Sequence, residues 1–350
     1  MSMKKEIFIG NVGIGGSHPI SIQSMTSTNT KDISKTLKQI EELEKEGCEI
    51  IRIAVPKRDY LDAFEKITKE SPLPVIADIH FDYKIAIESI KRGAKGIRIN
   101  PGNIGAKKRI DEIIRIATEN KTPIRIGVNS GSIEKKYKNQ DIPTYQAMVL
   151  SVLDHIKYFE DKDFTLLKLS LKSSDVIETI KAYRMIDKEC DYPLHLGVTE
   201  AGTRFGGTIK SAIGIGTLLA DGIGNTIRVS LTDNPVEEIK VAKEILKVLG
   251  LRDKGIEIIS CPTCSRITVN LIEKVDEFEY RIKNLKFNKK IKVAIMGCEV
   301  NGPGESEGAD IGIAFSKKNG YIFHKGKKIE TVNETFAIER LIELIKDKFI

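Results

Sequence analysis

The sequence of 350 residues contains no tryptophan, few aromatic residues (6%) and five cysteines. It lacks any uninterrupted apolar run of about 18 residues, the length that a membrane-spanning helix needs. The first residues, MSMKKEIFIGNVGIGG, have too short an apolar run and too many glycines for a signal peptide. These absences predict a cytoplasmic protein, in which paired cysteines bind metals or carry redox chemistry more often than they form disulfides.

The pattern of a nucleic-acid-binding protein is also missing. The net charge of +7 arises from 56 basic and 49 acidic side chains. The basic residues are spread along the chain rather than gathered in a stripe with interleaved aromatics. Most of them therefore belong to a solvated surface, and neither nucleic acid nor a membrane is expected as a partner. The charge instead favours a small anionic substrate or an acidic protein partner.

What the first 250 residues do contain is a regular alternation of short β-branched runs and amphipathic helical segments. Strands are predicted at residues 20–26, 49–55, 74–80, 95–101, 123–129, 165–171, 193–200 and 225–231. Segments such as DISKTLKQIEELEKEG lie between them and end in glycine, as helices often do. This rhythm predicts a TIM (β/α)8 barrel in residues 1–250. The alternative, a doubly wound sheet, usually has a G-x-G-x-x-G turn after its first strand, and none follows here.

An unusual set of polar side chains lies in or at the end of the predicted strands. The set is Arg52, Asp78, His80, Arg98, Asn100, Arg125, Asn129, Lys168, Glu200, Arg228 and Ser230. The carboxyl ends of barrel strands meet at one mouth, where active sites are built. Four arginines on four strands predict a clamp for a diphosphate, because a guanidinium group binds phosphate oxygens in pairs. The alternative is an internal salt-bridge layer with Asp78 and Glu200.

Two further segments complete the outline of the chain. The glycine-rich run 201–224 is predicted to be a loop that lets backbone N–H groups approach a phosphate. Residues 250–260 are predicted to be a linker into a small α+β domain, residues 257–350. This domain should contain a strand at 289–297, a sheet at 309–332 with turns at Asn319-Gly320 and Lys325-Gly326, and a final amphipathic helix.

The cysteines of this second domain point to a metal centre. CPTCSR places Cys261 and Cys264 together, and Cys298 stands in GCEVNGPGE. A thioredoxin-type dithiol would not need Cys298, and a zinc site would need a fourth ligand, for which His324 is the one nearby histidine. If these three thiolates bind an iron–sulfur cluster, one iron of the cluster is left without a thiolate ligand.

A carboxylate can complete such a cluster. The tight turn after Cys298 returns Glu305 seven positions on, with Glu299 and Glu307 as competitors on spacing. The isolated Cys48 and Cys190 are predicted to be packing residues.

Together these motifs closely resemble those of the bacterial 4-hydroxy-3-methylbut-2-en-1-yl diphosphate synthases. The resemblance is carried by CPTCSR and GCEVNGPGE, behind IRIAVP, DIHF, GIRINPGN, GVNSGS and LGVTEAG, and it spans nearly the whole chain. These are two-domain oxidoreductases of the non-mevalonate isoprenoid pathway. The resemblance implies a reductive ring opening and dehydroxylation of 2-C-methyl-D-erythritol 2,4-cyclodiphosphate, with a [4Fe–4S] cluster that takes electrons from ferredoxin or flavodoxin.

The resemblance also implies roles for individual residues. Cys261, Cys264, Cys298 and Glu305 match the cluster ligands, and Glu200 matches an acid beside the reacting carbons. The residues that match the substrate-binding positions are Arg52, Asp78, His80, Arg98, Arg125, Asn129, Lys168, Arg228 and Ser230. A head-to-tail homodimer is implied, in which the cluster domain of one subunit covers the barrel mouth of the other.

Two other classes of protein fit parts of the pattern. A zinc-dependent barrel hydrolase would use Cys261, Cys264, Cys298 and His324. An iron–sulfur regulator or electron carrier would use the cysteines alone. The polar barrel mouth argues against the carrier, because a carrier has no use for four convergent arginines.

Overall fold

The computed structural model describes residues 4–252, 254–283, 285, 287–298 and 308–350. The chain divides into two compact units, Met1–Leu251 and Arg252–Ile350. Within the described residues, no helix is long and apolar enough to cross a membrane.

The first unit is a barrel of parallel strands. The strands are β3 (Ser21–Met25), β4 (Ile50–Ala54), β5 (Val75–Asp78), β6 (Gly96–Ile99), β7 (Ile124–Asn129), β8 (Leu167–Lys172), β9 (His195–Leu196) and β10 (Thr226–Ile227). They pair in the order β8-β7-β6-β5-β4-β3-β10-β9, and a parallel bridge from Leu169 to Leu194 closes the ring between β8 and β9. The predicted TIM barrel is confirmed, and each of its strands lies within a segment predicted from the sequence or one residue beyond it.

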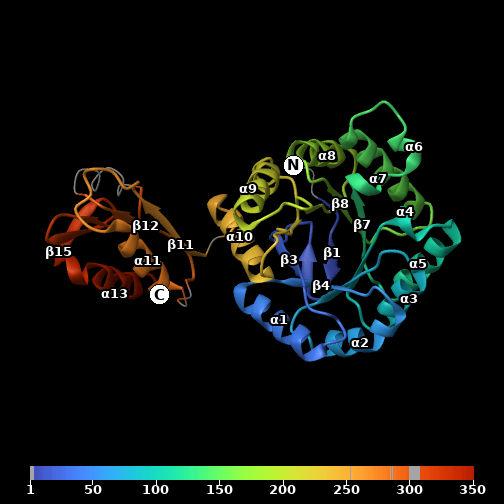
Figure 1. Ribbon diagram of the computed structural model, residues 1–350, viewed down its shortest axis with the longest axis horizontal. Coiled ribbons are helices and arrows are strands. Elements are labelled where there is room, and N and C mark those ends of the chain that lie inside the picture. Colours follow the sequence, from blue (N-terminus) through green and yellow to red (C-terminus); the bar gives the residue numbers. More distant parts are fainter. Residues whose placement is uncertain (1–3, 253, 284, 286, 299–307) are drawn as a thin grey trace. The chain divides into compact units, whose positions relative to one another are not determined.

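Helices surround these strands (Figure 1). The longer ones are α1 (Ile33–Glu46), α2 (Leu61–Glu70), α3 (Tyr83–Lys91), α5 (Lys107–Glu119), α7 (Thr144–Glu160), α8 (Val176–Glu189), α9 (Arg204–Ala220) and α10 (Pro235–Val248). Two short helices, α4 (Pro101–Ile104) and α6 (Lys135–Lys138), follow β6 and β7.

Helix α1 illustrates how the sequence sets these boundaries. The Asp32 side chain caps its first turn by accepting from the Lys35 N–H, and Gly47 ends it in the left-handed region at φ 107°. The buried Thr36, Ile40 and Leu43 recur every three or four residues, so one face of the helix packs on the barrel.

A hairpin of β1 (Ile7–Ile9) and β2 (Val12–Ile14), which the sequence analysis did not predict, packs at the amino end of the barrel. Its Ile7, Ile9 and Ile14 form a separate cluster with Ile50 and Ile76, near the starts of β4 and β5. The hairpin thus covers the end opposite the mouth, which leaves the carboxyl ends of the strands for chemistry.

The glycine-rich run 201–224 is a helix for most of its length, so the prediction of a phosphate-binding loop there was wrong. Helix α9 begins at Arg204, and its glycines serve close packing instead. A methyl group on Gly207 would lie 2.6 Å from Leu231 Cδ2, and one on Gly214 would lie 2.7 Å from Val198 Cγ2. The small residues let the helix approach the segments that follow β9 and β10.

The second unit is a five-stranded sheet packed against two helices. Its elements are β11 (Gly255–Ser260), α11 (Leu271–Ile282), β12 (Lys290–Met296), β13 (Ile311–Phe315), β14 (Asn319–His324), β15 (Lys327–Asn333) and α13 (Ala337–Phe349). The strands pair in the order β11 to β15; the first three are parallel and the last three antiparallel. Val293 and Ile295 alternate along β12 and pack with Leu341 of α13 in one core.

Two local predictions for this unit were wrong. Residues 255–260 form strand β11 rather than a linker, because the alternating GIEIIS pairs along its full length with β12. Asn319 and Gly320 open strand β14, and the turn lies before them, where the Ser316 N–H donates to the Asn319 carbonyl over 2.7 Å. The turn at Lys325-Gly326 is confirmed, with φ values of 48° and 73°.

Candidate active site

Charged side chains occupy inward-facing positions of the barrel strands. Asp78 of β5 pairs in register with Arg98 of β6, Arg98 with Arg125 of β7, and Arg125 with Lys168 of β8. These four residues and Arg52 are buried, each at 8% exposure or less. The sequence therefore places one layer of charge inside the barrel. Arg125 and Lys168 are the second residues of β7 and β8, so they lie deeper than the mouth at which the sequence analysis expected them.

Asp78 holds two of the arginines and a histidine. Its Oδ1 lies 3.9 Å from Arg52 Nη1 and 3.6 Å from Arg98 Nη1, and its Oδ2 lies 3.2 Å from His80 Nε2. Burial alone would raise the pKa of Asp78, but Arg52, the bond to His80 and Arg98 hold that pKa well below its usual range. Asp78 is therefore ionised and positions the cations beside it.

Glu238 of α10 is the carboxylate that pairs with Arg228, as Asp78 pairs with Arg52 and Arg98. Its Oε2 lies 3.8 Å from Arg228 Nη2 and accepts from Ser24 Oγ over 3.2 Å, while its Oε1 accepts from the Leu231 N–H. Burial, with repulsion from Arg52, lowers the pKa of Arg228 to about 10. Sequence reasoning missed Glu238, since a glutamate in the first turn of a helix is usually a surface residue.

Several polar atoms of this layer have no hydrogen-bond partner among the described residues. They are the Nε atoms of Arg52, Arg98, Arg125 and Arg228, Lys168 Nζ, both ring nitrogens of His195, and the side-chain amide of Gln23. Unpaired buried donors cost free energy, and so many together mark a place where a ligand or water supplies the acceptors. The salt-bridge alternative therefore accounts for only part of the layer.

Lys172, the last residue of β8, is a second inward-facing lysine that the sequence analysis missed. It follows Lys168 by four residues, so it lies about 13 Å nearer the carboxyl end of the strand. Burial, then Arg125 and Arg228, lower its pKa well below the usual value. The alternation Lys-Leu-Ser-Leu-Lys was the available signal, but the predicted strand ended at Leu171.

Glycines make room for these cations. A methyl group on Gly127 would lie 2.9 Å from Arg98 Nε, and one on Gly197 would lie 2.4 Å from Lys172 Nζ. Both glycines are in or next to inward-facing strand positions, where a side chain would push a cation away. The space inside the barrel is therefore shaped around the guanidinium and ammonium groups.

The remaining predicted residues lie at or near the strand ends. His80 is half exposed, with 49% of its side chain accessible, and Asn129 ends β7, where its N–H donates to Ser132 Oγ over 3.1 Å. Ser230 is half-buried two residues after Arg228. Asn100 is buried and caps α4 by accepting from the Gly102 N–H.

Glu200 stands apart from the paired carboxylates. It is exposed, and it adopts φ 51°, a left-handed backbone conformation that few residues other than glycine hold without strain. Its carboxylate makes no hydrogen bond or ion pair within the described part of the chain. Strained residues of this kind cluster at active sites, where the backbone fixes the direction of a side chain.

In the second unit, the three cysteines come from the carboxyl ends of neighbouring parallel strands. Cys261 directly follows β11, and Cys298 follows β12 after one glycine. The Gly297 N–H donates to Cys261 Sγ over 3.3 Å, which ties the ends of the two strands together at this sulfur. The loop that carries Cys264 is tied to the same glycine, since the Thr268 N–H donates to the Gly297 carbonyl over 2.9 Å.

This arrangement suits an iron–sulfur cluster in the type and origin of its donors. Cys298 is buried, Cys261 is half-buried and Cys264 is exposed. Over the described residues, no three His, Cys, Asp or Glu side chains stand in positions that would hold a single metal ion. Glu305, like Glu299 and Glu307, lies outside the described residues.

The geometry argues against a zinc site that includes His324. His324 ends β14 and pairs with Ile311, which in turn pairs with Val293 of β12. Cys298 lies five residues beyond Val293, so it is about 16 Å further along the strands and about 10 Å across them. Zinc ligands lie about 2 Å from the metal, so His324 and Cys298 cannot share one ion.

The other two cysteines are packing residues, as predicted. Cys48 is buried in the barrel core beside the Ile50 carbonyl, and burial raises the pKa of its thiol to about 12. Cys190 is half-buried at the end of α8, and burial raises its pKa as well. Neither thiol has the lowered pKa of a reactive cysteine.

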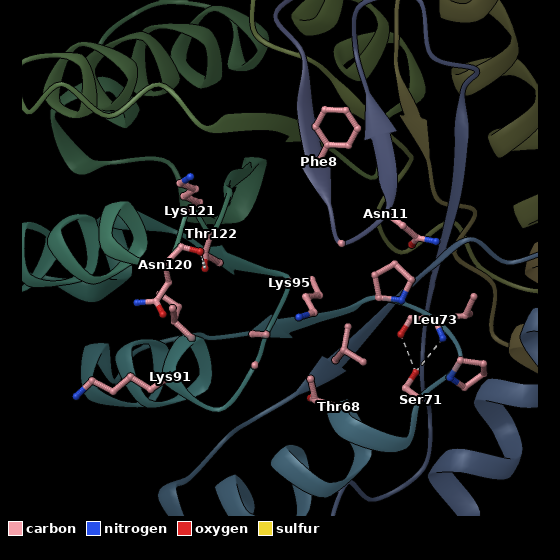
Figure 2. Close-up of a pocket in the computed structure, with 17 residues that line it drawn as sticks. Phe8, Asn11, Thr68, Ser71, Leu73, Lys91, Lys95, Asn120, Lys121 and Thr122 are labelled. Atoms are coloured by element: carbon pink, nitrogen blue, oxygen red, sulfur yellow. Dashed lines mark hydrogen bonds between the residues drawn. The ribbon is translucent and has the colours of Figure 1, made fainter.

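A pocket of about 760 Å³ lies at the opposite end of the barrel, between the β1–β2 turn and the starts of β5, β6 and β7. Figure 2 shows Phe8 and Asn11 of the hairpin facing Lys95 and Leu73 across it. The ammonium groups of Lys91 and Lys121 point in different directions and do not converge on one point (Figure 2). None of the predicted site residues lines this pocket.

Known proteins share this organisation. Residues 4–243 match the GcpE TIM-barrel domain, and residues 257–347 match the GcpE protein C-terminal domain. The chain belongs to the GcpE family. A member from Clostridium acetobutylicum, named 4-hydroxy-3-methylbut-2-en-1-yl diphosphate synthase (flavodoxin), is 53% identical over 97% of both chains. A second, from Thermodesulfovibrio yellowstonii and with the same name, is 51% identical over 98% of both chains.

Solved structures outside the family share the barrel. A spore coat polysaccharide biosynthesis protein of Bacillus subtilis superposes with a TM-score of 0.53 at 10% identity, over 70% of this chain and 72% of that one. At such low identity the likeness shows the barrel fold alone.

Proposed function

We propose that this chain is a 4-hydroxy-3-methylbut-2-en-1-yl diphosphate synthase of the non-mevalonate isoprenoid pathway, with flavodoxin as electron donor. It would reduce 2-C-methyl-D-erythritol 2,4-cyclodiphosphate, which takes up two electrons and a proton, opens its ring and loses a hydroxyl as water. The observation that carries the proposal is the layer of buried cations whose donors lack partners among the described residues. Relatives at about half identity that bear this name support it.

The barrel residues would bind and orient the diphosphate. Arg52, Arg98, Arg125 and Arg228 offer unpaired Nε–H groups that fit the many acceptor oxygens of a diphosphate. Lys172 would contact the diphosphate from the carboxyl end of β8, and Lys168 lies deeper in the barrel, in register with Arg125. Asp78, itself held by His80, would keep Arg52 and Arg98 in place, while Asn129 and Ser230 would bond oxygens at the rim.

Glu200 would give a proton to the departing hydroxyl. Its strained backbone fixes the carboxyl group at the end of β9, and it has no competing partner among the described residues. In the head-to-tail homodimer that we propose, the cluster unit of the partner would cover this mouth and exclude water.

The second unit would hold a [4Fe–4S] cluster through Cys261, Cys264, Cys298 and Glu305. The three thiols and the N–H of Gly297 that faces Cys261 suit such a group, and the packing of Cys298 would shield it. When bound, the cluster would supply electrons one at a time. All five cysteines are unpaired, which suits a reducing cytoplasm.

One experiment tests the cluster and the reaction together. Protein purified without oxygen should be brown, carry about four irons per chain and convert the cyclodiphosphate to the linear allylic diphosphate with reduced flavodoxin. The product is identified by mass spectrometry and phosphorus NMR. Colourless protein with one zinc per chain would overturn the proposal, and so would brown protein that binds no cyclodiphosphate.

A further inference from the structure

The charges inside the barrel do not balance. The cations are Arg52, Arg98, Arg125, Lys168, Lys172 and Arg228, and the carboxylates among them are Asp78 and Glu238. Asp78 pairs with Arg52 and Arg98, and Glu238 pairs with Arg228. No carboxylate of the described residues lies within 4 Å of the Arg125, Lys168 or Lys172 cation.

Lys168 is the most enclosed of these three. It is 1% exposed, and its Nζ has no hydrogen-bond partner in the part of the chain that the structure describes. As the second residue of β8 it lies deep in the barrel, away from the open mouth. A fully buried ammonium group without a counter-ion is strongly disfavoured relative to the neutral amine.

The groups around Lys168 reinforce this preference. Arg125 faces it from β7, Arg52 from β4, and Lys172 lies further along its own strand. His195 faces it from β9 and is fully buried. Helices α7 and α8 pack behind β8 with the buried His155 and Tyr183, and Tyr183 Oη is occupied by the Leu171 N–H and the His195 carbonyl.

We propose that Lys168 is a neutral amine in the substrate-free protein and takes up a proton from solvent when a cyclic diphosphate binds to the arginines. Two negative charges beside Arg52 and Arg125 would cancel their repulsion, so the ammonium form becomes stable. The inference rests on the proposed diphosphate binding. It makes Lys168 a positioning residue that stores a proton in the barrel before any electron arrives.

The lowered pKa of Lys168 agrees with this geometry. Burial is the main cause, followed by repulsion from Arg125 and Arg52. Binding of an anion removes the second cause and raises the pKa toward its ordinary value. A proton is then bound more tightly in the complex than in the free protein, so affinity for the diphosphate should fall as pH rises.

Titration calorimetry can count this proton. Oxidised protein with its cluster, and without any electron donor, is titrated with the cyclodiphosphate at one pH in buffers of different ionisation enthalpy, such as PIPES, HEPES and Tris. Each phosphate of the cyclic compound carries one ester and one anhydride bond and keeps a single strongly acidic group, so the ligand itself does not titrate near neutral pH. The slope of heat against buffer ionisation enthalpy should correspond to about one proton taken up per chain.

Variants assign the proton to its residue. Lys168→Met cannot be charged and Lys168→Arg is always charged, so both should bind the ligand with little or no proton uptake. His195→Gln should keep the wild-type uptake. The dissociation constant of the wild type should rise by up to about tenfold per pH unit in the titrating range, and that slope should vanish in Lys168→Met.

The outcomes separate this inference from the proposed function. Binding without proton uptake in the wild type overturns the role of Lys168 and leaves the diphosphate site intact. Uptake that persists in Lys168→Met also overturns it, and if His195→Gln abolishes the uptake the proton belongs to His195. Absence of any binding heat and of ligand-induced thermal stabilisation would count against the proposed function itself.

Discussion

Replacing Arg125 by methionine should weaken substrate binding without destabilising the barrel. Arg125 is 3% exposed and its Nε has no partner among the described residues. Burial, then Arg52 and Arg98, lower its pKa well below the usual value. In the free protein the guanidinium is thus a buried charge surrounded mainly by like charges. Methionine keeps the apolar stem of the side chain and removes the buried charge.

The size of the binding effect follows from what the guanidinium would contact. Hydrogen bonds that involve a charged group contribute about 1.5–3 kcal/mol. This corresponds to an increase of about 10- to 150-fold in the dissociation constant of the cyclodiphosphate. The melting temperature should stay level or rise, because a repelled charge has been removed.

The assay pairs calorimetric titration with thermal unfolding of the same preparations. Arg115→Met is the matched control, since Arg115 lies on the outer surface of α5 with 64% of its side chain exposed and pairs with Glu119. It should change neither affinity nor melting temperature appreciably. Unchanged affinity in Arg125→Met, together with a lower melting temperature, would refute the reasoning and make Arg125 a structural residue.

Four further changes test other parts of the site. Glu200→Gln should leave the fold and the colour intact but slow product formation by about 10²–10⁴-fold, and turnover at the wild-type rate would move the acid to another residue, with His80 next. Cys298→Ser should abolish colour and activity and Cys48→Ser neither, as absorption and iron analysis can check. Asp78→Asn should lower the free energy of unfolding at neutral pH. Because the pKa of Asp78 is depressed in the folded protein, the ionised carboxylate stabilises the fold above about pH 4, and this contribution is lost as the pH falls below that value. Denaturant titrations of the variant should therefore lack this pH dependence. Gly127→Ala should displace the Arg98 guanidinium, whose Nε would lie 2.9 Å from the new methyl group, and weaken binding several-fold, whereas Gly131→Ala, with open space around it, should not.

The barrel was predictable because its strands are short, β-branched and evenly spaced. The arginines were also predictable, because a charged residue inside an apolar strand is easily recognised in the sequence. His195 and Gln23 did not stand out, because one neutral polar residue in a strand also fits an ordinary core. Lys172 was missed by a single residue at the predicted strand end, and such ends are the least certain part of a pattern.

The errors in glycine-rich segments have a common physical cause. Glycine predicts a turn when only backbone freedom is considered. In α9 it is instead required by contacts with Leu231 and Val198, which come from distant parts of the sequence. At Asn319-Gly320, pairing with β13 and β15 extends a strand over residues that favour a hairpin turn. Packing decided these segments, and no local pattern carries that information.

The two units follow one rule for placing reactive groups. In the barrel, Asn129, Lys172 and Glu200 lie at or beyond the carboxyl ends of parallel strands, and in the small sheet Cys261 and Cys298 follow the carboxyl ends of the parallel β11 and β12. At such an end the chain leaves the sheet, so a side chain there has rigid support below it and open space above it. The antiparallel strands β14 and β15 carry none of the residues that match the cluster ligands. A diphosphate clamp and a cluster site can therefore each be built on a parallel sheet by the same device, a reactive side chain placed where a strand ends.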